Sequence, residues 1–307
     1  MNQYQIKTPI AFIIFNRPDL TQKVFNEIAK AKPPILLVIG DGPRKEKLGE
    51  DEIVRKTREI IQQVSWDCEV ITNYSEENLG CKYRVSSGLD WVFSMVKEVI
   101  ILEDDCLPND SFFTFCEEML DRYRDNKKIG IISGNNFQKG LLRGDGDYYF
   151  SKYVHIWGWA TWSDRWIGCY DVSMNDWPTY SQSEDYESLL CHSRKLKKYW
   201  TKTFESVYRG LVDTWDYQWL YSNWRYKRIN IMPNLNLISN IGFGANATHT
   251  KTENELSMIP ALKMNFPLKH PTTIEVNTAA DRLTEKYFTS NILLRVLTML
   301  LRKLKKL

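Results

Sequence analysis

The chain has 307 residues, a formal net charge of +3, 26% charged residues and 43% hydrophobic residues. Its length suits one large α/β domain with an extension, and so small a charge gives no reason to expect nucleic acid as a partner. Six cysteines without a CxxC pair or zinc-finger spacing indicate reduced, mostly buried thiols. The N-terminus shows no secretory signal, and no apolar stretch is long enough to span a bilayer.

The first hundred residues alternate between strand and helix patterns. Apolar, β-branched runs predict strands, and helical periodicity predicts the segments between them: strands at 10–15, 35–39, 68–72 and 99–102, and helices at 19–32, 44–64 and 84–95. This order predicts an α/β fold with a mostly parallel sheet and right-handed crossovers. Arg17, Asp41 and Asp105 each follow a predicted strand, so we expect them to share one crevice at the carboxyl edge of the sheet.

Three adjacent carboxylates, Glu103, Asp104 and Asp105, follow the strand at 99–102. Adjacent carboxylates repel one another and cost several kcal/mol each to desolvate unless a cation or hydrogen bonds compensate them. Neighbouring side chains along a turn point in different directions, so one or two of the three can reach the same divalent metal. The alternative is a solvated acidic turn.

Neither common glycine-rich phosphate loop occurs, which argues against dinucleotide oxidoreductases and P-loop kinases. A bound diphosphate would need a metal and a few cationic side chains. Arg17 can supply one charge, and Lys82 and Arg84 lie near a predicted helix start that favours an anion or a base edge. Asp41 can accept a hydrogen bond from uracil. For these residues a surface arginine, a solvated helix face and a simple Asp-Gly-Pro turn are the alternatives.

The acidic turn and the following segment 110–115, Asp-Ser-Phe-Phe-Thr-Phe, resemble the Glu-Asp-Asp motif of the N-acetylglucosaminyltransferase I family and its bacterial relatives. The likeness extends over about residues 8–250. It implies a GT-A fold, Rossmann-like, that binds a UDP-sugar with Mn²⁺ or Mg²⁺. It also implies that Asp105 binds the metal, with Glu103 and Asp104 beside the nucleotide sugar.

The second half is rich in aromatic residues between 148 and 226. Such side chains stack on sugar faces, although for any single tryptophan a core position is the better expectation. Gly158 and Trp159 lie in the segment 155–160, which we expect to form a loop over the sugar or the acceptor.

Asp213 and Asp216 are the candidate general bases, because they are three residues apart and share a face if the segment is helical. Resemblance to the family's Trp-Asp-Asp-Trp favours Asp216, and Asp213 is alternatively the N-cap of the following helix. The segment 238–249 resembles a family loop that closes over the diphosphate, with Thr248 and His249 as its polar contacts.

The last residues, 289–307, combine five basic with ten apolar side chains and no acidic one. This pattern predicts an amphipathic helix in the interface of an anionic membrane, with a helix that binds a partner or a second copy as the alternative.

These observations predict a metal-dependent glycosyltransferase that moves a sugar from UDP-sugar to a glycan or lipid-linked saccharide acceptor with inversion. The alternatives are a nucleotidyltransferase acting on sugar phosphates and a non-catalytic protein that binds glycans or membranes. The expected organisation is a GT-A domain at 1–250, with nucleotide-binding and acceptor halves at about 1–135 and 136–250. An extension at 251–288 and the basic helix at 289–307 follow. We expect a cytoplasmic protein, peripheral at the inner face of the membrane.

Overall fold

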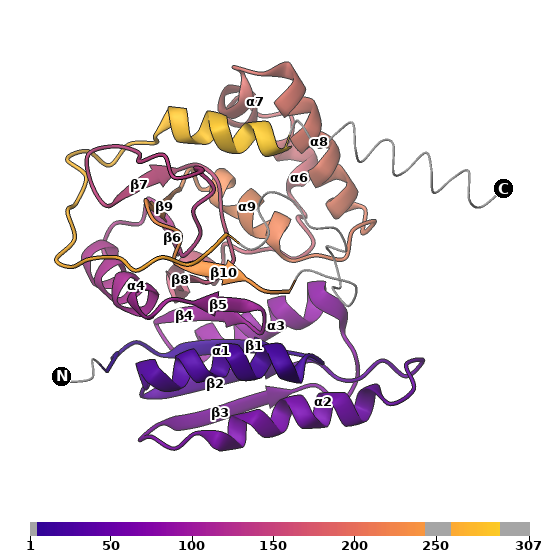
Figure 1. Cartoon of the computed structure of the whole chain (residues 1–307). Coiled ribbons are helices and arrows are strands. Elements are labelled where there is room, and N and C mark those ends of the chain that lie inside the picture. The colour runs from indigo at the N-terminus through magenta and orange to yellow at the C-terminus, as the bar shows by residue number, and fades with distance from the viewer. Residues whose placement is uncertain (1–4, 243–258, 289–307) are drawn as a thin grey trace.

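The computed structural model describes residues 5–242 and 259–288 (Figure 1). Its strands are β1 (Ile10–Ile14), β2 (Ile35–Gly40), β3 (Glu69–Tyr74), β4 (Glu98–Glu103), β5 (Cys106–Pro108), β6 (Ile129–Ser133), β7 (Tyr148–Ser151), β8 (Trp159–Trp162), β9 (Ile229–Pro233) and β10 (Ile238–Asn240). Its helices are α1 (Pro18–Ala31), α2 (Glu50–Glu59), η1 (Ile60–Gln63), α3 (Gly80–Met95), α4 (Asp110–Tyr123), α5 (Ser163–Trp166), α6 (Trp177–Tyr180), α7 (Glu184–Leu190), α8 (Arg194–Tyr208) and α9 (Asp216–Arg225). Residues 278–288 form a further helix.

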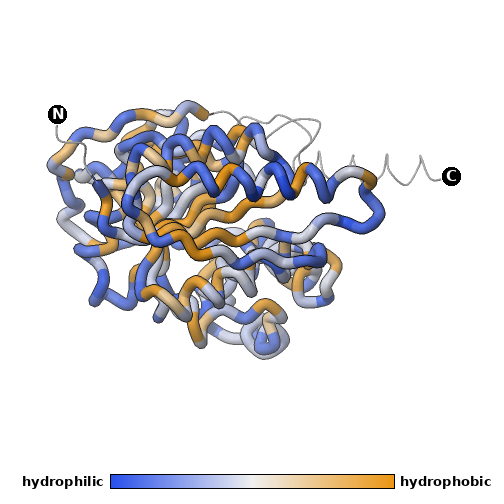
Figure 2. Tube along the Cα trace, turned by 90° about the horizontal axis from the view of Figure 1, so that it is seen from below, coloured by the Kyte–Doolittle hydropathy of each residue, from blue (hydrophilic) through white to orange (hydrophobic). Residues whose placement is uncertain are grey.

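Eight strands form one sheet in the order β3-β2-β1-β4-β8-β6-β9-β7. The first four are mutually parallel, as β1 pairs with β2 and β4, and β2 pairs with β3. This confirms the predicted α/β fold with its parallel N-terminal sheet. In Figure 2 the apolar strands run between more polar helices, which explains why β1 and β4 are near-continuous apolar runs.

The strand β8 lies between β4 and β6 and is antiparallel to both. β6 pairs with β9 in parallel, and β7 closes the edge antiparallel to β9. One sheet therefore runs through both the predicted nucleotide-binding half and the predicted acceptor half. β5 and β10 form a separate antiparallel pair directly after the acidic turn.

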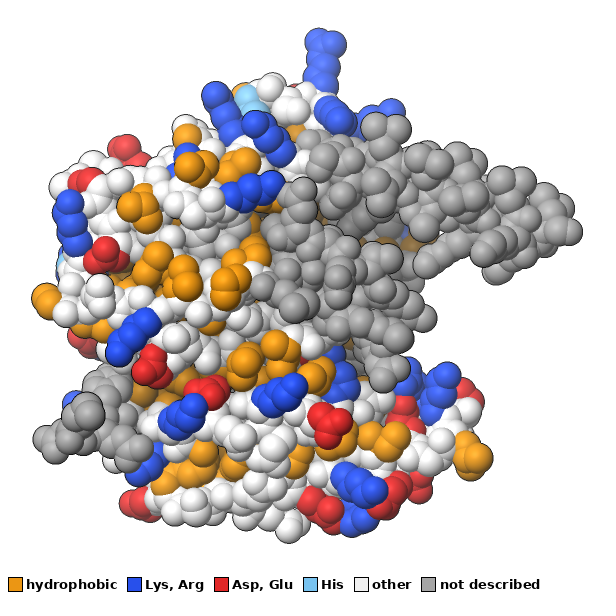
Figure 3. All heavy atoms as spheres, viewed as in Figure 1, with side chains coloured by type: hydrophobic (Ala, Val, Ile, Leu, Met, Phe, Trp, Pro, Cys, Tyr) orange, Lys and Arg blue, Asp and Glu red, His pale blue; other side chains and the backbone are white. Residues whose placement is uncertain are grey.

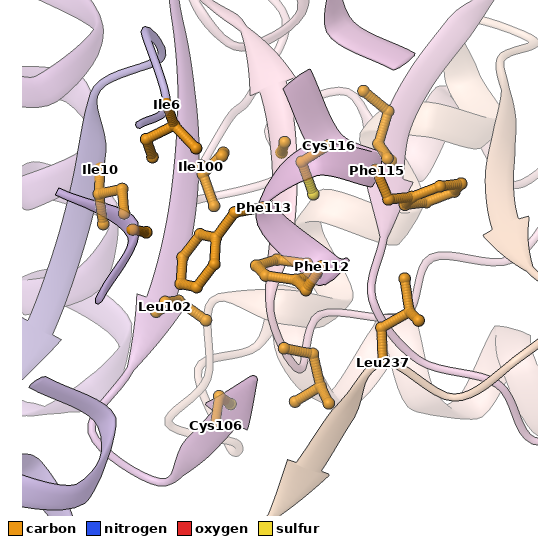
Figure 4. Packing of buried hydrophobic residues seen from close by; sticks show 14 of the residues in the cluster. Ile6, Ile10, Ile100, Leu102, Cys106, Phe112, Phe113, Phe115, Cys116 and Leu237 are labelled. Atoms are coloured by element: carbon orange, nitrogen blue, oxygen red, sulfur yellow. The ribbon is translucent and has the colours of Figure 1, made fainter. Parts of the chain in front are cut away.

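The two faces of the sheet have different cores. On one face, aromatic side chains of α4 pack toward Ile100 and Leu102 of β4 (Figure 4). On the other face, Trp159, Trp166 and Trp219 form the centre of an aromatic cluster. Most of the aromatic side chains in the second half are therefore core residues, as expected for single tryptophans.

The segment 259–288 packs along the far edge of the sheet. Val276 forms a bridge with Phe150 of β7, and the Ser151 hydroxyl donates a hydrogen bond of 2.5 Å to Asp281 in the final helix. Among the described residues no helix combines the length and apolarity needed to cross a membrane. The predicted amphipathic helix at 289–307 lies outside the described residues.

Candidate functional site

A cleft of about 630 Å³ opens at the carboxyl ends of β1, β2 and β4. Side chains from both halves of the chain line it, including Phe15, Arg17, Asp41, Arg44, Cys81, Arg84, Glu103, Asp104, Asp105, Ile156, Trp157, Asp213, Thr214, Asp216 and Tyr217. The predicted meeting of Arg17, Asp41 and Asp105 in one crevice is confirmed. A second hollow of about 780 Å³ lies between α2 and the edge strand β3, but it lacks the acidic turn. The cleft is therefore the candidate site.

Arg17 neutralises part of the acidic turn. It follows β1, and its guanidinium donates to Asp104 through Nη2 and to Asp105 through Nη1, the latter at 2.9 Å. The side chain of Asp104 is 4% exposed and that of Asp105 is 15% exposed. The contact with Asp104 is thus the buried end of this fork, and the contact with Asp105 is the end nearer the cleft.

One guanidinium does not compensate three carboxylates. Burial raises the pKa of Glu103, and the negative charges of Asp105 and Asp104 raise it further. Burial likewise raises the pKa of Asp104, although Arg17 opposes that change. The turn therefore favours additional positive charge, whether it comes from protons or from a cation.

The donor set of the turn fits a small divalent cation that is shared with a ligand. Among the described residues, no three histidine, cysteine or carboxylate side chains are grouped to hold a metal by themselves. Mg²⁺, however, usually binds to one or two carboxylates together with waters and phosphate oxygens. Gly242 lies against Asp105, and an added Cβ would stand 2.1 Å from Oδ2. A glycine there leaves space beside the carboxylate oxygens.

Asp41 is already engaged by the protein. Its carboxylate accepts hydrogen bonds from the backbone of Gly42, Leu79 and Gly80 and from the side chain of Asn78, at 2.9–3.0 Å. These bonds fix the end of β2 to the start of α3. The turn role matches the simpler alternative, and the predicted bond from uracil stays a prediction, since Asp41 also lines the cleft.

Lys82 and Arg84 are buried rather than displayed at the helix start. Arg84 donates from Nε to the carbonyl of Gly40 at 3.1 Å and from Nη2 to the side chain of Asn73 at 2.7 Å. It therefore ties α3 to the ends of β2 and β3. Arg84 also forms part of the cleft wall, and its predicted contact with an anion or a base edge stays a prediction.

Asp213 and Asp216 both line the cleft, but they do not share a helical face. α9 begins at Asp216, and Trp215 occupies its N-cap position. Asp213 instead accepts a hydrogen bond of 3.0 Å from the backbone N–H of Lys82 in the first turn of α3. It caps a helix as the alternative expected, but not the predicted helix.

Gly158 and Trp159 do not line the cleft. Trp159 is fully buried and stacks on Trp215 with ring centroids 5.8 Å apart. Gly158 has φ +64°, and an added Cβ would lie 2.6 Å from Ile238. Backbone conformation and packing account for this glycine, so the expected contact with sugar is corrected. Ile156 and Trp157, from the same segment, do line the cleft.

No protein-family profile matches this chain, and no curated protein matches it. Among solved structures it is similar to a UDP-glucose pyrophosphorylase complexed with UDP-glucose, with 11% identity, a TM-score of 0.29, and coverage of 48% of this chain and 68% of that one. It is similar to HddC from Yersinia pseudotuberculosis complexed with GMP-PN, with 8% identity, a TM-score of 0.30, and coverage of 50% and 77%. It is also similar to the 4-diphosphocytidyl-2C-methyl-D-erythritol synthase of Anaerococcus prevotii, with 13% identity, a TM-score of 0.31, and coverage of 58% and 78%.

The main functional prediction, a glycosyltransferase, is corrected, because these structures give it no support. None of the three structures is named as a glycosyltransferase, and a link to the N-acetylglucosaminyltransferase I family finds no support. The names correspond better to the alternative, a nucleotidyltransferase acting on sugar phosphates. With TM-scores of about 0.3 these likenesses carry no argument about this chain, so the activity has to be argued from the cleft itself.

Sequence reasoning missed Arg44, which lines the cleft from the end of β2. Its guanidinium forms an ion pair with buried Glu50 and lies over the ring of Phe15, 5.5 Å from the centroid. Glu50 also accepts a bond of 2.9 Å from Asn16 in the turn after β1. An arginine soon after a strand end was a usable signal, because Arg17 follows the end of β1 in a similar way.

Thr248 and His249 lie outside the described residues, so their predicted contacts with a diphosphate stay predictions.

Proposed function

We propose that the chain is a nucleotidyltransferase that acts on sugar phosphates with a divalent cation. The supporting observation is the pairing of opposite charges in one cleft. The carboxylates of the turn at 103–105 face a cleft that also contains Arg17 and Arg44. A nucleotide with its phosphates and a hard cation needs both kinds of group.

In the proposed reaction, a phosphate oxygen of the sugar phosphate attacks the α-phosphorus of a nucleoside triphosphate. A new P–O bond forms, the bond from the α-phosphorus to the bridging oxygen breaks, and pyrophosphate leaves with that electron pair. Arg17 and Arg44 would neutralise charge on the phosphates as they are displaced. When bound, a divalent cation would further withdraw charge from the phosphate oxygens, and Asp105 is the residue we expect to hold it.

The other wall of the cleft suits the sugar. Trp157 and Tyr217 offer aromatic surface, and Asp216 offers a carboxylate that can accept hydrogen bonds from hydroxyl groups. The Thr214 hydroxyl and the backbone N–H of Tyr217 both bind Asp216 Oδ1. Those bonds orient the carboxylate, so we propose Asp216 as a residue that positions the sugar phosphate.

Pyrophosphate exchange tests the proposal. The protein is incubated with a panel of nucleotide sugars, Mg²⁺ and radiolabelled pyrophosphate, and labelled nucleoside triphosphate is measured. We expect label to enter the triphosphate with one or a few nucleotide sugars, and Arg44→Gln to slow this by roughly 10–100-fold, the loss of one charged hydrogen bond. Lys45→Gln is the matched control, because Lys45 is exposed and pairs with Glu77 outside the cleft wall.

Release of a nucleoside diphosphate from the nucleotide sugar, with no triphosphate formed, would overturn the proposal. So would exchange that continues undiminished after chelation of divalent cations.

Association with anionic membranes through residues 289–307 remains a separate proposal from the sequence. Full-length protein and a variant lacking these residues can be compared by co-sedimentation with anionic vesicles at low and high salt. We expect binding of the full-length protein only, and weaker binding as salt rises. Equal sedimentation of both proteins would contradict the anchor.

A further inference from the structure

We propose that Arg17 is a resident counter-ion that gives up its contact with Asp105 when the divalent cation and nucleotide bind, and then binds a phosphate. This inference rests on the proposed function, because it describes how the same cleft passes from its free to its loaded state. It concerns which groups Arg17 contacts before and after the ligands bind. The proposed reaction does not by itself require this exchange of contacts.

The fork of Arg17 has two unequal ends. Nη2 pairs with Asp104, whose side chain is 4% exposed and also lies 3.4 Å from the backbone N of Phe15. Nη1 pairs with Asp105 Oδ2 at 2.9 Å, and Asp105 is more exposed. The first contact is an anchor held by the fold. The second is the one a cation arriving through the cleft meets.

A cation and Arg17 compete for the same oxygen. Asp105 Oδ2 is the atom that Nη1 contacts, and Oδ1 is approached by the Cys106 thiol at 3.5 Å. A divalent ion on Asp105 would stand close to a guanidinium, and like charges at such a distance repel strongly when water is partly excluded. Release of Nη1 removes this repulsion.

The charge balance favours the exchange. Three carboxylates, with Arg17 as the cation that contacts two of them, keep a deficit of positive charge at the turn. A divalent ion supplies that charge, and the phosphates that arrive with it supply new acceptors for the guanidinium. Arg17 remains anchored on Asp104 while its free Nη1 binds a phosphate oxygen. Only the hydrogen bond between Arg17 Nη1 and Asp105 has to break.

Two other roles for Arg17 make different predictions. A purely structural tie would organise Asp104 and Asp105 for the cation, so its loss would weaken cation binding. A simple phosphate ligand would not affect binding of the cation alone. Of the three roles, only competition predicts that removing the charge of Arg17 strengthens binding of the cation and weakens binding of the nucleotide.

The experiment makes two measurements on the full chain. Binding of Mn²⁺ alone is measured by electron paramagnetic resonance. Binding of UDP in saturating Mn²⁺ is then measured by calorimetry. Arg17→Met keeps an unbranched side chain and removes the charge. We expect this variant to bind Mn²⁺ alone about tenfold more tightly and to bind UDP with Mn²⁺ roughly 10–100-fold more weakly. Lys45→Met is the matched control, since it removes one exposed positive charge and should change neither affinity by more than about twofold.

Unchanged or weaker binding of Mn²⁺ alone by Arg17→Met would overturn the inference and leave the proposed function intact. Failure of the proposed function appears elsewhere, as absence of pyrophosphate exchange by the unmodified protein. If Arg17→Met does not fold because Asp104 is left unpaired, the double variant Arg17→Met/Asp104→Asn is compared with Asp104→Asn alone. The same tighter binding of Mn²⁺ is then required.

Discussion

We expect His155 to make the protein sensitive to mild acid. The side chain is 6% exposed, and neither ring nitrogen has a hydrogen-bond partner among the described residues. Its ring lies 4.6 Å from that of Phe137. Burial lowers the pKa of His155 from 6.5 to about 4. The folded protein therefore binds fewer protons than the unfolded chain between these values, and stability falls as the pH drops through this range.

A difference of one unit between the pKa values of the folded and unfolded states corresponds to about 1.4 kcal/mol. His155 should therefore lower the free energy of unfolding by on the order of 3 kcal/mol at pH 4 and by about 2 kcal/mol at pH 5. His155→Leu replaces the ring by an apolar side chain of similar size and removes the titrating group. Urea unfolding at pH 7.5, 6.5, 5.5 and 5.0 gives the free energy of unfolding of both proteins. We expect the difference between them to change by about 2 kcal/mol in favour of the variant at pH 5.

Parallel curves for His155→Leu and the unmodified protein down to pH 5 would refute the reasoning. They would mean that the His155 ring is hydrated or protonated in the folded state.

Three further predictions concern the packing and electrostatics of the fold, and urea unfolding tests each of them. Gly158→Ala should cost about 2–4 kcal/mol of stability, because the backbone is left-handed and the added Cβ would contact Ile238. Gly140→Ala is the control, with φ +79° and no atom near the added Cβ, and it should cost only about 1–2 kcal/mol. Equal losses would contradict the packing argument. Burial raises the pKa of Asp281 to about 6, so the folded state retains a proton that the unfolded chain has lost. The stability of the unmodified protein relative to Asp281→Asn should therefore fall from pH 4 to pH 7. A stability difference that does not vary with pH would count against this. Asp213→Ala removes the cap on α3 and should cost about 1 kcal/mol, and no measurable loss would show that solvent replaces the cap.

The parallel half of the fold could be predicted because its signal is local. Each buried strand is a short apolar run, and each helix between strands has its own periodicity. The predicted helix at 44–64 nevertheless begins only at Glu50. Gly49, at φ +79°, and the ion pair between Arg44 and Glu50 fold the preceding residues into a turn. A charged segment with helical composition does not reveal such a turn.

The cleft could be located from the sequence, because strand ends of a parallel sheet meet at one edge. The direction of its side chains could not be predicted. Arg84 is a cation at a helix start, but it points at backbone carbonyls beneath the cleft. Asp213 bonds Lys82 across 131 positions of sequence, and no local pattern encodes that distance. Trp159 directly follows Gly158 yet forms part of the core.

The surface gives a further physical reason to look for function in the cleft. On the face shown in Figure 3, acidic and basic side chains are interspersed over the region of α2 and β3. Such a mixture produces little long-range field of one sign. The surface beside α2 and β3 therefore does little to steer a charged ligand of one sign toward the cleft.

During synthesis the strands β1 to β4 leave the ribosome before β8, the strand that lies next to β4 in the sheet. β8, which pairs with β4, follows about sixty residues later, and β9, which pairs with β6, later still. The backbone of Ile241 then donates a bond of 2.8 Å to the carbonyl of Asp105. A nascent chain thus carries an open edge at β4 and an acidic turn without its final cover. Non-local pairing of this kind slows folding, and we expect the cleft to become able to bind its ligand only after residues up to Gly242 have been translated.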